Sequence, residues 1–136
     1  MDKRVLQVSR IFSRRFAEQG ADAVVLWGSR VRGDSYAESD IDIGVVSKGR
    51  HYRLERYQGF LVSTSWATAR QHRRDFRDPG KVGGIIPAWR NALIIYDPKG
   101  VAKALKQAAQ DWRWELLGKS VDTWVGEELT GWAEEV

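Results

Sequence analysis

The chain has 136 residues and a formal net charge of +4, with 43% hydrophobic and 29% charged residues. This length and balance predict one globular domain with a single core, and the mild positive charge is compatible with an anionic ligand such as a nucleotide or RNA. The absence of cysteine excludes disulfides, zinc-thiolate sites and thiol catalysis, and two histidines argue against a histidine-based metal site.

The first predicted element is a helix over residues 3–19. Val5, Val8, Phe12 and Phe16 recur at helical spacing, and Gly20 is typical of the position after a helix. The N-terminus therefore leads into an amphipathic segment instead of an apolar signal sequence. No apolar run approaches the roughly eighteen residues of a membrane span, so we expect a soluble, cytoplasmic protein without membrane contact.

An apolar run over residues 23–27 predicts a buried strand, which Gly28 and Ser29 end. Gly28 lets a phosphate approach the backbone closely, and Ser29 offers a hydroxyl and an amide where the following segment begins. Arg30 and Arg32 lie within reach of the same phosphates, or are plain surface positions; the sequence leaves both interpretations open.

The second predicted strand, residues 40–46, alternates carboxylates with β-branched residues. Side chains two apart on a strand point to the same face, so Asp40 and Asp42 project together while Ile41 and Ile43 are buried. Neighbouring carboxylates raise each other's pKa unless a cation lies between them. Oxygen ligands on a strand suit Mg²⁺, which binds one or two protein carboxylates together with substrate phosphates.

Residues 51–57 and 60–66 predict a β-hairpin around a turn at Gln58 and Gly59. In its second arm, one face carries Phe60, Val62, Thr64 and Trp66, and the other carries Leu61, Ser63 and Ser65.

Thr68 and Gln71 predict a capping box for a helix that reaches about Phe76. Along one side of this helix runs an arginine stripe, Arg70, Arg73, Arg74 and Arg77. The stripe either grips a triphosphate or RNA backbone or is a solvated helix face, and the second interpretation is slightly favoured. We expect His72 at the surface.

The remaining pattern predicts a short helical turn over residues 81–86 that ends before Pro87, then an apolar strand over 92–96. After a turn at residues 97–100, a helix places Val101, Leu105, Ala108, Trp112 and Leu116 on one face. Residues 120–136 predict an amphipathic C-terminal helix, so the chain divides into a core of residues 1–119 and this helix. Its apolar face needs a partner: the domain itself, a second subunit in a homo-oligomer, or a helical domain absent from this chain.

Gly28-Ser29, ten intervening residues and Asp40-x-Asp42 resemble the signature of the DNA polymerase β-like nucleotidyltransferase superfamily, which includes minimal and small-molecule nucleotidyltransferases. The resemblance implies an α/β (α+β) fold, a small mixed β-sheet flanked by helices. It also implies that Gly28 and Ser29, with Arg30 and Arg32 nearby, bind the nucleotide. Asp40 and Asp42 would then be the catalytic residues that bind the metal.

In that family a third carboxylate follows the aspartate pair, on the metal-facing side of a later strand. The matching positions here hold Ser63 and Ser65, and no acid occurs between Glu55 and Asp75. A serine hydroxyl is a poor substitute for a charged Mg²⁺ ligand. Asp75 and Asp78 are the nearest other acids in the sequence, but both lie past the strand.

Three functions follow as hypotheses. The first is a Mg²⁺-dependent nucleotidyltransferase that moves a nucleoside monophosphate, with AMP from ATP as the expected group, to a hydroxyl of a small-molecule or protein acceptor. The second is a catalytically weak nucleotide- or protein-binding module, similar to the antitoxins that pair with HEPN-type toxins. The third, ranked last, is RNA binding through the arginine stripe.

Overall fold

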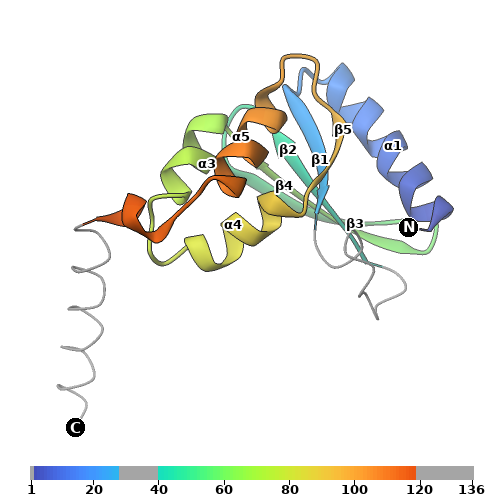
Figure 1. Ribbon diagram of the computed structural model, residues 1–136. Helices are drawn as coiled ribbons and strands as arrows, with labels where there is room; N and C mark the ends of the chain where they lie inside the picture. Colours follow the sequence, from blue (N-terminus) through green and yellow to red (C-terminus); the bar gives the residue numbers. More distant parts are fainter. Residues whose placement is uncertain (1, 28–39, 119–136) are drawn as a thin grey trace, which may run out of the picture.

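The computed structural model describes residues 2–27 and 40–118 (Figure 1). In chain order, the elements are α1 (Lys3–Glu18), β1 (Ala23–Trp27), β2 (Asp40–Val46), β3 (His51–Tyr57), β4 (Phe60–Ala67), α3 (Ala69–Asp75), α4 (Val82–Arg90), β5 (Leu93–Tyr96), α5 (Val101–Gln110) and the 3₁₀ helix η1 (Trp114–Leu117). The predicted C-terminal helix over 120–136 lies outside the described residues. Within the described ranges, no helix is long and apolar enough to cross a membrane.

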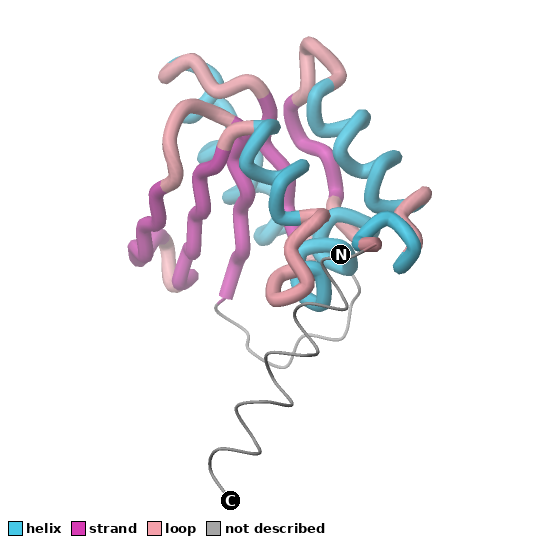
Figure 2. The backbone as a smooth tube through the Cα atoms, turned by 90° about the vertical axis from the view of Figure 1, so that its left-hand side faces the viewer, coloured by secondary structure: helices cyan, strands magenta, loops and turns pink. Residues whose placement is uncertain are grey.

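The five strands form one mixed sheet in the order β3-β4-β2-β1-β5 (Figure 2). β2 and β4 are parallel, whereas the other neighbouring pairs are antiparallel. The register aligns Trp27 of β1 with Asp42 of β2, and Asp42 with Ser63 of β4. These three residues therefore form a row across the middle of the sheet.

Helices cover both faces of the sheet: α1 packs on one, and α3, α4 and α5 pack on the other (Figure 1). β1 supplies both cores by alternation, because Val24 and Leu26 pack with α1 while Ala23 and Val25 pack with the three later helices. The predicted fold class, a small mixed sheet flanked by helices, is confirmed.

The predicted N-terminal helix is also confirmed. In α1 the four apolar residues at helical spacing are buried, and the Asp2 side chain accepts a hydrogen bond from the backbone of Arg4 at the start. After the helix, Gly20 has a φ of 90°, a conformation that glycine adopts at little cost.

α4 differs from the prediction, because it continues through Pro87 to Arg90. Proline removes one helical hydrogen bond, but contacts of the last turn hold the helix together. The Trp89 side chain is fully buried, and the Arg90 guanidinium donates to the carbonyl oxygens of Ala109 (2.7 Å) and Trp112 (3.1 Å). Tertiary packing here outweighs the local signal that a proline gives.

Two further predictions are corrected. His72, expected at the surface, is only 5% exposed and lies in the helix-side core. The helix predicted after the turn at residues 97–100 is shorter than expected: α5 ends at Gln110, and Leu116 belongs to η1, where its side chain is 60% exposed. Asp97 lies just before α5, and its carboxylate accepts backbone hydrogen bonds from Ala102 (3.0 Å) and Lys103 (2.8 Å) in the first turn of that helix.

Candidate functional site

β2 presents its two aspartates on the helix-side face of the sheet. The alternate residues Ile41 and Ile43 are fully buried in the core beneath α1, so Asp40 and Asp42 face the opposite way. Asp40 is exposed at the start of the strand, and Asp42 is half-buried two residues further on. The structure thus brings the two predicted acids together on one face.

Asp42 lies in the wall of a hollow of about 380 Å³ between the sheet and α4. Strand residues line one side and α4 with its C-terminal end lines the other: Trp27, Asp42, Ser63, Ser65, Gly84, Pro87, Ala88 and Asn91. One carboxylate, two hydroxyls and an amide therefore converge on a space with an otherwise largely apolar wall. A concave site with a few convergent polar groups is typical of ligand binding.

The charge of Asp42 is disfavoured in this position. Burial is the main cause that raises the pKa of its carboxyl group, and the neighbouring charge of Asp40 raises it further. A cation beside the pair would remove both penalties, because it would compensate the lost hydration and screen the repulsion. The two carboxylates are also hard oxygen ligands, as Mg²⁺ requires.

Ser63 stands where a third carboxylate would be expected, directly beside Asp42 in the parallel register of β2 and β4. Its hydroxyl donates a hydrogen bond to the Tyr52 hydroxyl on β3 at 3.0 Å. Ser65, also on β4, lines the same hollow. Among the described residues, no group of three or more acidic or histidine side chains gathers as a metal site.

The side chains of Asp75 and Asp78, the next acids in the sequence, form interactions away from the hollow. Asp75 is buried and pairs with Arg50 at 3.1 Å and with Lys81 at 3.3 Å. Asp78 accepts a hydrogen bond from the backbone of Gly80 within its own turn. Neither residue lines the hollow beside Asp42.

Trp27 is a site residue that sequence reasoning did not single out. Its indole ring lies over Gly44 of β2, so closely that a β-carbon on Gly44 would come within 2.4 Å of the ring. The signal in the sequence is this glycine in the middle of a strand, which often marks a close approach of another group. Gly44 therefore makes room for the aromatic wall next to Asp42.

Behind this wall, Trp27 belongs to an aromatic cluster. The rings of Trp27 and Trp89 lie edge to face at 5.4 Å between centroids, and the His72 ring lies 5.1 Å from that of Trp89. The Trp89 indole N–H donates to Nδ1 of His72 at 3.3 Å. Burial lowers the pKa of His72 to about 4, so at neutral pH the imidazole is uncharged and can accept this bond.

The predicted phosphate-binding residues, Gly28, Ser29, Arg30 and Arg32, lie outside the described residues, and their role stays a prediction. The arginine stripe is not part of the hollow. It lines a separate groove of about 600 Å³, which shares no lining residue with the hollow beside Asp42.

The described structure therefore combines a small mixed sheet flanked by helices with an aspartate pair on β2 beside a hollow. Residues 5–130 match the family model described as "Nucleotidyltransferase domain", so the chain belongs to the nucleotidyltransferase domain family.

Comparison with solved structures finds the same fold. The crystal structure of a nucleotidyltransferase-like protein from Exiguobacterium sibiricum 255-15 is similar, with a TM-score of 0.62 and 12% sequence identity. The match covers 81% of this chain, which spans only 40% of that protein. No curated protein sequence matches the chain.

Proposed function

We propose that this protein transfers a nucleoside monophosphate, AMP from ATP, to a hydroxyl group of an acceptor and depends on Mg²⁺ to do so. The main support is the half-buried Asp42, paired with Asp40 on one face of β2 in the wall of the hollow. Membership of the nucleotidyltransferase family supports the same chemistry.

The residues present fit a magnesium ion. Its coordination shell needs only one or two protein carboxylates when phosphate oxygens complete it, and Asp40 and Asp42 would provide these. When bound, Mg²⁺ supplies positive charge that neutralises the triphosphate. Gly28 and Ser29 are proposed to hold the triphosphate tail, with Arg30 and Arg32 beside it.

The reaction itself is a phosphoryl substitution. The acceptor hydroxyl loses its proton to the surrounding water, and its oxygen forms a bond to the α-phosphorus. The bond from that phosphorus to the bridging oxygen breaks, and pyrophosphate leaves. The protein's part is to align these groups and to hold charge near them, since positioning and electrostatics carry most of the catalysis in phosphoryl transfer. The hollow beside Asp42 offers the acceptor an aromatic wall, Trp27, and polar groups from β4 and Asn91.

The second candidate is a catalytically weak module that binds a nucleotide or a protein, such as an antitoxin-like partner of a HEPN-type toxin. The observation in its favour is the hydroxyl of Ser63, tied to Tyr52, beside the aspartate that would hold the metal. A hydroxyl in that place weakens metal binding, because it carries no charge.

The two candidates differ in turnover. The purified chain would be incubated with ATP labelled at the α-phosphate, with Mg²⁺ and with mixed hydroxyl-bearing acceptors, and both pyrophosphate release and label transfer would be measured. We expect Asp40→Asn and Asp42→Asn each to lower transfer by about a hundredfold or more, since each removes a charge from the metal site.

Asp111→Asn is the matched control, because Asp111 is an exposed acid whose side chain, among the described residues, is hydrogen-bonded to Gln107 alone. It should leave the rate unchanged. Transfer that continues undiminished in the Asp42→Asn protein would refute the enzymatic proposal. ATP binding without any turnover would favour the weak binding module.

A further inference from the structure

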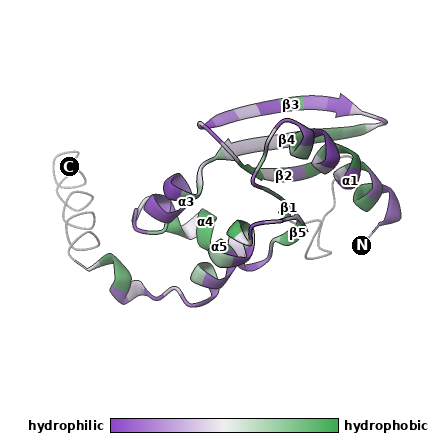
Figure 3. Cartoon of the chain, turned by 90° about the horizontal axis from the view of Figure 1, so that it is seen from above, coloured by the Kyte–Doolittle hydropathy of each residue, from purple (hydrophilic) through white to green (hydrophobic). Residues whose placement is uncertain are grey.

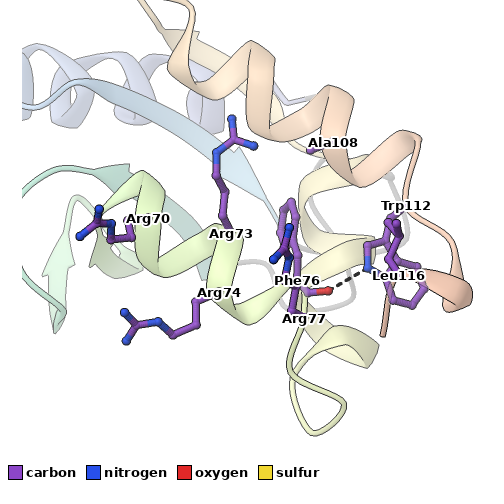
Figure 4. Close-up of a pocket in the computed structure, with 8 residues that line it drawn as sticks. All are labelled: Arg70, Arg73, Arg74, Phe76, Arg77, Ala108, Trp112 and Leu116. Atoms are coloured by element: carbon purple, nitrogen blue, oxygen red, sulfur yellow. Dashed lines mark hydrogen bonds between the residues drawn. The ribbon is translucent and has the colours of Figure 1, made fainter. Parts of the chain in front are cut away.

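A groove of the described structure lies on the helix side, between α3 and the segment formed by α5 and η1 (Figure 4). It measures about 600 Å³. The lining combines four arginines with four apolar residues: Arg70, Arg73, Arg74, Phe76, Arg77, Ala108, Trp112 and Leu116. None of them lines the hollow beside Asp42, so the groove is separate from the site of the proposed reaction.

The arginines of the groove are exposed, and within the part of the chain that the structure describes none of their guanidinium groups forms an ion pair. Other arginines differ in this respect: Arg50 pairs with Asp75, and Arg90 binds two carbonyl oxygens. Four like charges within eight residues repel one another, so an acidic group bound here would be favoured.

On the apolar side of the groove, Phe76 and Trp112 are buried, whereas Leu116 is open to solvent. The Trp112 indole donates a 2.8 Å hydrogen bond to the Phe76 carbonyl oxygen, which fixes α3 against the segment after α5 (Figure 4). Next to it, Leu116 is 60% exposed and Trp114 is 64% exposed. A ligand that fits this surface must therefore bury apolar side chains as well as present negative charge, as an acidic amphipathic peptide does and a free polyphosphate does not.

The chain itself contains such a segment. Residues 119–136 hold five acidic residues and one lysine, a formal charge of −4, whereas residues 1–118 hold 21 basic and 13 acidic residues, a formal charge of +8. Apolar residues recur through this segment at helical spacing: Val121, Trp124, Val125, Leu129, Trp132 and Val136. Glu128 and Glu135, seven apart, would lie along one edge of that apolar face.

The segment also begins beside the groove. Only two residues separate the lining residue Leu116 from Lys119, and a short tether of this kind gives the segment a high effective concentration at the groove. Between them Gly118 has a φ of 51°, a left-handed value that permits an abrupt change of chain direction. We propose that residues 119–136 dock into this groove of their own chain, with their apolar side on the exposed Leu116 and their carboxylates on the arginines.

Hydrogen exchange of the full chain tests this proposal. At low salt we expect the amides of residues 119–136 to exchange about tenfold or more slowly than in an unstructured peptide. Raising the salt to roughly 1 M should remove most of this protection, because the Debye length falls to about 3 Å. Exchange at the unstructured rate in the unaltered protein at low salt would overturn the proposal.

Two matched double charge reversals, one in the groove and one on α1, test whether the segment contacts the groove arginines. The double variant Arg70→Glu/Arg74→Glu should lose the protection, while Arg10→Glu/Arg14→Glu, with the same spacing and charge change on exposed positions of α1, should keep it. Adding Glu128→Arg/Glu135→Arg to the first variant should restore it. Equal protection in both reversals would refute docking at these arginines.

These experiments also distinguish two other possible occupants of the groove, a second copy of the chain and an RNA. If protection appears only at protein concentrations at which sedimentation shows a dimer, the occupant is a second copy, and the intramolecular proposal fails. If the segment exchanges freely while a fluorescent single-stranded RNA binds the unaltered protein but not Arg70→Glu/Arg74→Glu, the groove is a nucleic-acid site, and the proposal fails equally. Neither outcome depends on nucleotidyl transfer.

Discussion

At the residue scale, the contact between Trp27 and Gly44 shapes the candidate site. The indole ring occupies the space that any β-carbon at position 44 would need, and the ring forms the wall beside Asp42. A small side chain on β2 and a large one on β1 are therefore a matched pair. Changing either one should disturb the hollow as well as the core.

Gly44→Ala should destabilise the fold by about 1–3 kcal/mol, because the ring or the strand must move to accommodate a methyl group. In a Trp27→Ala background, the same change should cost about 0.5 kcal/mol or less, since the obstructing ring is gone. Urea unfolding of the four proteins measures both values. Gly83→Ala, on the open side of α4, is the control and should stabilise the fold by about 0.5–1 kcal/mol. Equal costs of Gly44→Ala in both backgrounds would show that the ring is not the obstacle.

His72 predicts a pH dependence of stability. Burial lowers the pKa of its imidazole, the charge of Asp75 opposes this shift and the charge of Arg50 adds to it, and the resulting pKa is about 4. The unfolded chain takes up the proton near pH 6.5, so the contribution of the neutral imidazole is complete above about pH 6.5 and is lost as the pH falls toward 4. Between about pH 7 and pH 5, this single group should remove about 2 kcal/mol.

The measurement is urea unfolding at both pH values. His72→Gln keeps a neutral hydrogen-bond acceptor but cannot titrate, so the difference between the two pH values should shrink. His51→Gln, at an exposed position, should behave as the unaltered protein does. A pH dependence that persists unchanged in His72→Gln would place its origin in other groups.

At the element scale, the parallel pairing of β2 and β4 decides which residue stands beside Asp42. The hairpin of β3 and β4 returns the chain so that Ser63 aligns with Asp42. A carboxylate at this position would lie on the same face as the aspartate pair and would complete a three-acid site.

We therefore expect Ser63→Asp to raise Mg²⁺-dependent transfer by about tenfold or more, because a third charge strengthens metal binding. The added acid should have no effect when Asp42→Asn is also present. Ser47→Asp, which adds the same charge beyond the end of β2, is the control. No gain in activity from Ser63→Asp would mean that a missing carboxylate does not limit the reaction.

Local patterns predicted most elements correctly. The alternation of Asp40 to Ile43, the β3-β4 hairpin and the capping box of Thr68 and Gln71 all depend on neighbours in the sequence, and all appear in the structure. The capping box is formed by hydrogen bonds of 2.8 and 3.0 Å. The predictions that failed, at Pro87, His72 and Leu116, concern contacts between elements distant in the chain.

The site follows the same division. The sequence predicted that Asp40 and Asp42 share one face of β2. It also predicted that Ser63 and Ser65 share one face of β4, because the alternation of side chains along a strand is local. That the face of Asp42 meets the face of Ser63 depends on the parallel register, and that α4 closes the hollow depends on tertiary packing. Neither could be derived from the order of residues alone.

At the scale of the whole molecule, ligand binding should appear as stability. A ligand that binds only the folded chain stabilises it by about 2.7 kcal/mol at a hundred times its Kd. For Mg²⁺ with ATP, this corresponds to a rise in Tm on the order of 10 °C for a chain of this size. The rise in Tm reports binding without turnover, so this measurement also applies to a catalytically weak module.

Thermal unfolding with ATP, with and without Mg²⁺, measures the effect. Asp42→Asn should lose the part that depends on Mg²⁺, whereas Asp111→Asn should retain it. An equal rise in Tm when EDTA removes the metal would contradict a magnesium site at the aspartate pair. A Mg²⁺-dependent rise in Tm that survives in Asp42→Asn would place the metal-bound nucleotide elsewhere in the molecule.

This chain spans 40% of the similar protein from Exiguobacterium sibiricum 255-15. Part of the sheet in this chain is not covered by its helices. Tyr52 and Leu54 of β3 lie on the same face as Asp42 and Ser63, yet they are 58% and 53% exposed. The three helices cover the middle of this face and leave the β3 end open (Figure 3). An acceptor approaching Asp42 can therefore arrive across a partly apolar, solvent-facing platform.

The position of β3 at the border of the sheet has a consequence for how the protein behaves when concentrated. An edge strand has unpaired backbone amides and carbonyls, to which strands of other molecules can pair. β3 carries Arg53, Glu55 and Arg56 among its seven residues and is coloured mainly hydrophilic in Figure 3. We therefore expect these charges to oppose the fibre-like stacking that an uncharged edge strand would favour.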